Sequence, residues 1–300
     1  MEVLIIDREQ WLRERKKGIG GSDVAAILGL SKWKSAYDIW VDKTTDVLQE
    51  EYSNESIYWG NVLEEIVAQE FSKQTGFKVR RNNKILQHPE YYWMRASIDR
   101  KIVGENALLE CKTTSEYNKN EWKDEEIPLN YILQCMHYLA VTGFEKCYIA
   151  CLVGGRHFIY KEILRNEEVI KVIIEKERIF WQEHVEKNIP PEVDGSESCK
   201  KLLDSQYEPV DNLEIDLDNQ NKIDLLIKDL EYLKSQKKVC DDQLKLIGAN
   251  ITETENKIKT ILGAKGSINT QNYKLVYKDY EVKERVTKGY KYSRLTFKKL

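Results

Sequence analysis

Hydrophobic and polar positions alternate with different periods along this chain, and the changes of period predict its elements. Helical spacing, with apolar positions three and four apart, is found from about residue 7, from residue 35, and over 60–76, 129–142 and 166–186. Strand-like apolar runs occupy 77–87, 92–97, 98–103, 107–113, 146–153 and 156–164. The last two runs are separated by Gly154-Gly155, which is a tight-turn dipeptide of hairpins. This order predicts an α/β (α+β) fold, with a mixed β-sheet flanked by helices.

The pattern changes in the last third of the chain. Apolar positions step by three and four through 223–261, and only Lys237 and Thr254 interrupt them, which is typical of a coiled-coil helix. One continuous helix would be about 60 Å long. The alternatives are a hairpin near 235–242 or a break at Gly248. The apolar seam of this arm requires a partner, and packing on the rest of the same chain is as compatible with the pattern as an external partner.

The final stretch, 266–300, alternates as strands do and carries nine basic residues against three acidic ones. Five interleaved tyrosines suit a surface that binds a nucleic-acid backbone and stacks on exposed bases, although tyrosines of a small sheet equally form its own core. We therefore expect three parts: a first domain over 1–194, a helical coiled-coil-like arm over 195–265, and a small basic β-rich tail over 266–300.

Composition limits the classes of protein that fit. Charged residues make up 32% of the 300 positions and the net charge is −3, which excludes a generally basic protein of non-specific affinity. An enzyme that acts on DNA would therefore have to concentrate its basic residues locally. No apolar run reaches the length of a membrane span, and the first residues lack the features of a signal sequence. Six scattered cysteines favour a reduced, cytoplasmic protein.

Three charged residues suggest metal-dependent chemistry. If 107–113 is a strand, its period of two places Glu110 and Lys112 on one face, near Asp99 at the end of the preceding run. Two carboxylates at such a short distance repel each other and require a hard cation such as Mg²⁺ between them. The lysine can orient a water molecule or help to deprotonate it. The alternative is a solvated strand edge with an incidental ion pair.

Two further segments supply candidates. Ser22 follows a glycine turn and precedes an apolar run, so it is expected to be the N-cap of a helix; with Arg15 close by, this helix start suits a terminal phosphate. An ordinary capped helix is the alternative. In the helix over 60–76, Glu64 borders the apolar stripe and can point inward to complete a metal site.

Five motifs occur in a particular order: GIGGSDVAAILG, GNVLEE, ASIDRKIV, LLECKTT and YILQCMHYLAVTG. Together, over residues 8–190, they resemble the YqaJ viral recombinase family, whose members are related to phage lambda exonuclease within the restriction-endonuclease-like nucleases. One departure is Ile98, which stands where the family usually has proline before the aspartate. Proline at this place shapes the strand end and binds no metal, so the expected catalytic residues are unaffected.

The resemblance implies a metal site and a catalytic lysine. By position, Glu64, Asp99 and Glu110 would hold Mg²⁺, for which Mn²⁺ can substitute, and the main-chain carbonyl of Cys111 would be a further ligand. Lys112 would act on the attacking water.

It also implies two substrate-contacting pairs. Arg15 and Ser22, seven residues apart as in the lambda enzyme, would bind the 5′-terminal phosphate. Tyr131 and Gln134 match a helical Tyr-X-X-Gln that borders the active site and positions water or the scissile phosphate. Without the rest of the pattern, Gln134 would be interpreted as an amide on the surface of a helix.

The function implied is that of a phage or prophage recombination exonuclease. It would remove nucleotides from double-strand DNA ends, 5′ to 3′, and leave 3′ overhangs for a single-strand annealing protein, in the cytoplasm of a bacterial host. A ring-like homo-oligomer, a trimer by resemblance, would surround the DNA. The alternatives are a structure-selective or site-specific endonuclease on the same core and a non-catalytic DNA-end-binding scaffold.

Overall fold

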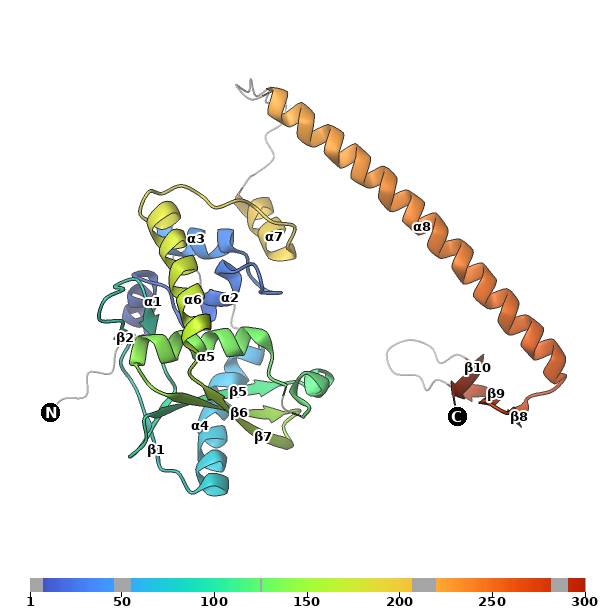
Figure 1. Cartoon of the computed structure of the whole chain (residues 1–300), viewed down its shortest axis with the longest axis horizontal. Coiled ribbons are helices and arrows are strands. Elements are labelled where there is room, and N and C mark those ends of the chain that lie inside the picture. Colours follow the sequence, from blue (N-terminus) through green and yellow to red (C-terminus); the bar gives the residue numbers. More distant parts are fainter. Residues whose placement is uncertain (1–7, 46–54, 125, 207–219, 282–290, 300) are drawn as a thin grey trace. The chain divides into compact units, whose positions relative to one another are not determined.

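The structure, a computed structural model, describes residues 8–45, 55–124, 126–206, 220–281 and 291–299. These residues form two compact units, Met1–Pro209 and Val210–Leu300 (Figure 1). The first unit contains the sheet and the helices that flank it, and the second contains one long helix followed by a small sheet.

A mixed five-stranded sheet organises the first unit. Strands β5 and β6 pair in parallel, and the other neighbouring pairs in the order β1-β4-β5-β6-β7 are antiparallel. The predicted mixed α/β fold is therefore confirmed. Both turn glycines between β6 and β7, Gly154 and Gly155, have positive φ (59° and 71°), as the expected hairpin turn requires. The strands are β1 (Val79–Arg81), β4 (Arg100–Ile102), β5 (Ala107–Thr114), β6 (Lys146–Val153) and β7 (His157–Leu164).

The two faces of β5 bury different clusters because successive side chains alternate. Leu109 and Cys111 pack with Phe71 of α4 (Glu55–Thr75). Leu108, on the opposite face, packs with Leu139 of α5 (Leu129–Thr142). Helix α4 thus covers one face of the sheet and α5 covers the other, while α6 (Glu167–Ile179) packs against α5 (Figure 1).

Short helices complete the first unit. They are α1 (Arg8–Lys16), η1 (Gly21–Asp23), α2 (Val24–Ile27), α3 (Ala36–Thr44), η2 (Glu116–Trp122) and α7 (Glu197–Gln206). Ser35, at which the predicted helix begins, caps α3, because its side chain accepts the Asp38 N–H. Fully buried Cys199 of α7 packs against Tyr37 and Val41 of α3. The first unit consequently extends past residue 194, where the sequence placed the end of the first domain.

Two expected elements differ in the structure. The run 77–87 is divided: β1 belongs to the large sheet, whereas β2 (Leu86–Gln87) pairs with β3 (Arg95–Ala96) in a separate small sheet. The expected helix over 166–186 is α6 followed directly by a π-helical turn, Phe180–Val185. Neither change could be derived from apolar periodicity alone, since that signal does not specify the sheet or the exact helical pitch.

The second unit begins with α8, one uninterrupted helix from Gln220 to Leu262, so the hairpin and the break considered above do not occur. A three-stranded antiparallel sheet follows in the order β10-β9-β8, which agrees with the strand pattern of the tail. Residues 282–290, with part of the basic residues of the tail, lie outside the described residues. The strands are β8 (Gly266–Asn269), β9 (Tyr273–Glu281) and β10 (Lys291–Lys299).

Candidate active site

The pairing of β4 with β5 brings the acidic residues of the two strands together. Asp99, directly before β4, accepts the Cys111 N–H of β5 at 2.8 Å through Oδ2. Glu110 and Lys112 lie on one face of β5, as the alternation predicts, and Lys112 Nζ donates to Glu110 Oε1 at 2.7 Å. The three charged residues singled out in the sequence thus form one cluster at the sheet.

The cluster is electrostatically unbalanced. Burial and the neighbouring Glu110 charge raise the pKa of Asp99 well above its usual value. Burial also raises the pKa of Glu110, although Lys112 opposes this. Glu110 Oε2 is buried and has no hydrogen-bond partner among the described residues. A single ammonium therefore faces two carboxylates, and the site favours additional positive charge.

Helix α5 supports Glu110 from the other side. Gln134 Nε2 donates to Glu110 Oε1 at 2.7 Å and to the Tyr138 hydroxyl at 3.0 Å. Gln134 is only 7% exposed, so it is not a surface amide. Tyr131, one turn earlier, places its ring 5.1 Å from Lys112 Nζ. Both residues of the expected Tyr-X-X-Gln pair thus contact the charged cluster.

Glu64 projects from α4 toward Asp99, but its carboxylate is bound by a different partner. Arg100, buried next to Asp99, donates to Glu64 Oε1 at 2.6 Å and to Glu65 Oε2 at 2.8 Å. In keeping with this, the described residues contain no group of three or more acidic, histidine or cysteine side chains that could hold a metal ion. The assignment of Glu64, Asp99, Glu110 and the Cys111 carbonyl as a complete ligand set stays a prediction.

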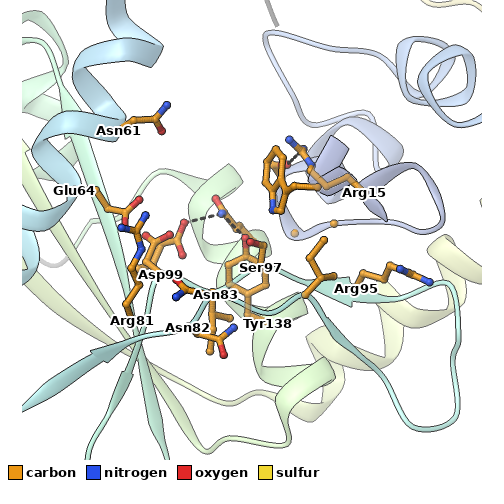
Figure 2. Close-up of a pocket in the computed structure, with 18 residues that line it drawn as sticks. Arg15, Asn61, Glu64, Arg81, Asn82, Asn83, Arg95, Ser97, Asp99 and Tyr138 are labelled. Atoms are coloured by element: carbon orange, nitrogen blue, oxygen red, sulfur yellow. Dashed lines mark hydrogen bonds between the residues drawn. The ribbon is translucent and has the colours of Figure 1, made fainter. Parts of the chain in front are cut away.

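An open cavity of about 670 Å³ lies in front of these residues. Figure 2 shows Glu64 and Asp99 on one side of it and Arg15 on the other, with Tyr138 between them. The remaining wall mixes apolar and polar side chains. The polar ones, which the sequence pattern did not single out, include Asn61, Arg81, Asn82, Asn83 and Arg95. A cavity that is lined by carboxylates and also by Arg15, Arg81 and Arg95 suits a phosphate-bearing polymer.

Arg15 and Ser22 meet at the far side of the cavity. Arg15 Nη2 donates to Ser22 Oγ at 3.3 Å, and its guanidinium stacks over the ring of Trp11 at 4.8 Å. The expected N-cap role of Ser22 is wrong: Gly20 precedes the 3-10 turn that contains Ser22, and Asp23 provides the side-chain bond to the Gly20 N–H. The Ser22 hydroxyl consequently faces the cavity instead of capping a helix.

Close packing explains the glycines of this turn. A Cβ at Gly21 would lie 2.6 Å from the Tyr138 ring and 3.0 Å from Gln134, and one at Gly18 would lie 2.5 Å from the Trp93 carbonyl oxygen. Buried Asp23 also bonds Lys43 at 2.9 Å, and Lys43 and Arg15 lower its pKa although burial alone would raise it. The glycines let the Arg15–Ser22 segment approach α5, and the Asp23–Lys43 ion pair joins the segment to α3.

Sequence comparison identifies the family. Residues 10–145 match the model of the YqaJ-like viral recombinase domain. The chain is also 48% identical over 248 residues to the uncharacterized protein YqaJ of Bacillus subtilis. The aligned region covers 80% of this chain and 78% of that protein. The chain belongs to the YqaJ-like viral recombinase family. Four residues of the family motifs, namely Asp99, Glu110, Lys112 and Gln134, are the ones that converge in the cluster.

Solved structures share the fold. The alkaline exonuclease LHK-Exo from Laribacter hongkongensis aligns with a TM-score of 0.50 at 19% identity, over 66% of this chain and 100% of that one. LHK-Exo in complex with dAMP gives 0.51 at 21% identity, with the same coverage. The YqaJ-like chain thus shares the restriction-endonuclease-like fold of these alkaline exonucleases.

Arg100 and Tyr138 are the contributors to this site that sequence reasoning missed. Arg100 had a recognisable signal, since it is a charged residue that directly follows Asp99 within a strand-like run. Tyr138 lies one helical turn after Gln134, so it shares a face with that residue. Asn82 and Asn83 of the cavity wall lie between β1 and β2 in the chain and had no such signal.

Proposed function

We propose that this chain is a Mg²⁺-dependent exonuclease that hydrolyses DNA from double-strand ends. The observation that carries the proposal is the cluster of Asp99, Glu110 and Lys112. The pKa values of the half-buried Asp99 and the buried Glu110 are raised, and Glu110 Oε2 has no partner among the described residues. Asp99 and Glu110 line a cavity of about 670 Å³, which would accommodate the end of a DNA strand.

The donor set fits a hard divalent cation. Asp99 and Glu110 would hold Mg²⁺ through carboxylate oxygens, with Glu64 and the Cys111 carbonyl as further ligands. Mn²⁺ has the same preference for oxygen and would substitute. When bound, such a cation polarises a phosphate oxygen and lowers the pKa of a water ligand. The proposed chemistry needs these oxygens and no cysteine thiolate or histidine.

Side chains of the cluster and of α5 would supply the rest of the proposed chemistry. The Lys112 ammonium would orient the attacking water and offset the negative charge that develops on the phosphate. Gln134 would keep Glu110 in place, and Tyr138, whose pKa is raised by burial and by Glu110, would remain a neutral hydroxyl facing the cavity. Tyr131 would position Lys112 through its ring.

Arg15 and Ser22 support a 5′ to 3′ polarity. Their shared position across the cavity from the carboxylates would let them bind a 5′-terminal phosphate while the next phosphodiester bond reaches Glu110. Successive cleavage from that end leaves a 3′ single-stranded overhang, which is the substrate of a single-strand annealing protein. We place this reaction in the cytoplasm of a bacterial host, in a homo-oligomer of three subunits, following the family resemblance. Among the described helices, none has both the length and the apolar character needed to cross a bilayer.

Cleavage of linear and covalently closed circular duplexes, each with Mg²⁺ and with a chelator, tests the proposal. We expect only linear DNA to be lost, only with Mg²⁺, and Glu110→Gln to reduce the rate more than about a hundredfold while DNA binding persists. Nicking of the circle would favour the endonuclease alternative. Binding of DNA ends without any cleavage would leave the scaffold alternative.

A second pair of substrates tests the polarity of digestion: the same duplex with 5′-phosphate ends or with 5′-hydroxyl ends. Wild-type protein is expected to prefer the phosphate, and Arg15→Ala to erase that preference, since a charge-assisted bond of this kind contributes about 1.5–3 kcal/mol. Lys17→Ala is the matched control, because Lys17 is a neighbouring cation that bonds Glu14. An unchanged preference in Arg15→Ala would place the phosphate site elsewhere.

A further inference from the structure

Helix α8 carries a regular apolar seam that the nuclease proposal does not use. Its a and d positions repeat every seven residues through 39 residues, a period that gives two or more helices a left-handed supercoil. We define the α8 seam as Ile223, Leu226, Leu230, Leu233, Lys237, Cys240, Leu244, Ile247, Ile251, Thr254, Ile258 and Ile261.

The seam is exposed. Leu226 is 59% accessible to solvent, Leu244 is 68% and Ile261 is 85%. A long single helix with such a stripe gains little from propensity, and most of the stability of helices in proteins comes from packing of the apolar face. Exposed apolar surface of this extent marks an interaction surface.

We propose that the occupant of the α8 seam is the same helix of another copy of this chain, parallel and in register. The polar layers carry the argument. In a parallel pair, Lys237 meets Lys237 and Thr254 meets Thr254, so no polar side chain faces an apolar one. In an antiparallel pair centred on the middle of the seam, Lys237 would face Ile247 and Thr254 would face Leu230. A single lysine at an a position is a known determinant of register, because its long stem lets the ammonium reach solvent.

Charges beside the seam agree with this arrangement. Asp229 occupies a g position and Lys234 the following e position, five residues later. In parallel strands the g residue of one helix faces the following e residue of the other, which pairs these opposite charges in both directions. The surface is therefore complementary to itself. A second row of apolar residues occupies the c positions but ends at Leu246, whereas the α8 seam continues to Ile261. The α8 seam is therefore the surface that a partner helix would bury along the whole of α8.

Cys240 provides a direct test in the full chain. It is a d residue and is exposed, whereas the other five cysteines are buried. Opposed d residues of a parallel pair lie close enough for a disulfide, whereas the antiparallel pair offsets the two Cys240 residues along the axis. Diamide would oxidise two Cys240 thiols to one disulfide and accept their two electrons and two protons. We expect a covalent dimer on a non-reducing gel, in a yield that does not fall on tenfold dilution of the protein.

Single-site controls define the geometry. Cys240→Ser should abolish the covalent dimer. In that background, Ile247→Cys, at the next d position, should restore it, and Asp242→Cys, on the outward face, should not. Equal cross-linking through both of the added thiols, or none through Cys240 in the wild type, would overturn the parallel arrangement.

Two glutamate substitutions inside the α8 seam test whether the seam holds the copies together. Leu226→Glu with Leu244→Glu should reduce Cys240 cross-linking at least tenfold. Leu225→Glu with Leu246→Glu adds the same charge to exposed leucines outside the seam and should leave it unchanged. Circular dichroism and cleavage of linear DNA establish that both proteins are folded. Equal effects of the two pairs, or an effect of the second alone, would exclude the α8 seam as the interface.

Discussion

Lys112 lies between two carboxylates, and this restricts its part in hydrolysis. Burial would lower the pKa of its ammonium, but Glu110 and Asp99 outweigh burial and raise it. While both carboxylates carry charge, Lys112 therefore remains protonated at neutral pH and orients water or offsets charge more readily than it removes a proton. Of the two roles that its motif suggests, the structure favours the electrostatic one.

Arg100 is the residue that decides where the Glu64 carboxylate points. Arg100→Gln should remove the guanidinium that orients the Glu64 carboxylate, and it should therefore weaken Mg²⁺ binding by about 10–100-fold. Higher Mg²⁺ concentration should rescue cleavage in part, as expected for a residue that acts through a ligand. Glu65→Gln is the matched control, since it removes only the outer carboxylate from the same guanidinium. Cleavage rates measured over a range of Mg²⁺ concentrations separate the two variants. A loss of maximal rate with unchanged Mg²⁺ dependence would exclude this positioning role.

The pKa values of Asp99 and Glu110 predict how Mg²⁺ affects stability at different pH. Both pKa values are raised above those of the unfolded chain, near 4, so without Mg²⁺ these groups make the folded state less stable as pH rises through their folded pKa values. Mg²⁺ competes with protons for the same oxygens, so the stabilisation by Mg²⁺ should grow with pH.

Thermal unfolding with and without Mg²⁺ measures this effect. Near neutral pH, at a concentration about a hundredfold above the dissociation constant, Mg²⁺ should raise Tm by about 5–10 °C, and by less at mildly acidic pH. The Asp99→Asn variant should lose most of the increase. A shift that is independent of pH, or unchanged in Asp99→Asn, would contradict the assignment of these carboxylates as ligands.

At the scale of elements, the glycine turn before α2 packs closely against side chains of α5. Gly21→Ala should lower stability by about 1–3 kcal/mol, because the added Cβ would lie 2.6 Å from Tyr138 and force the ring aside. Gly20→Ala is the control at the adjacent position, where the nearest atom would lie at an ordinary 3.7 Å. Denaturant unfolding compares the two. Equal stability of both variants would mean that the turn shifts to accept the methyl group.

Some elements could be predicted because their signals are local. The alternation in ALLECKTT and the Gly154-Gly155 turn are properties of a few consecutive residues, and β5 and the β6–β7 hairpin formed as expected. The assignment of Ser22 as an N-cap was wrong, because the Asp23 carboxylate accepts the Gly20 N–H at the start of the turn. The same carboxylate pairs with Lys43, which is distant in the chain. The position of Arg100 after Asp99 was a local signal, but its partners Glu64 and Glu65 lie on α4, distant in the chain, and could not be derived from it.

At the scale of the whole molecule, the two compact units separate the residues of the candidate site from the helical arm and the basic tail. Every residue that we assign to the site belongs to Met1–Pro209. The family match, residues 10–145, also lies inside this unit. The second unit therefore has no assigned part in the chemical step, and its α8 seam and basic strands are expected to affect assembly and DNA affinity.

Truncation tests this division. A chain that ends at Pro209 should fold and cleave linear duplex, whereas one that ends at Gly195 also loses α7 and should be less stable by about 2–4 kcal/mol, because Cys199, Leu202 and Leu203 no longer cover Tyr37 and Val41. If the basic tail binds backbone phosphates, the 1–209 chain should show a smaller salt dependence of DNA binding, by about 0.9 in the slope for each phosphate that the tail neutralises in the full protein. Unfolding curves, cleavage rates and binding at several salt concentrations compare both chains with the full protein. An unchanged slope would remove the tail from the path of the DNA, and failure of the 1–209 chain to fold would show that the second unit is required by the first.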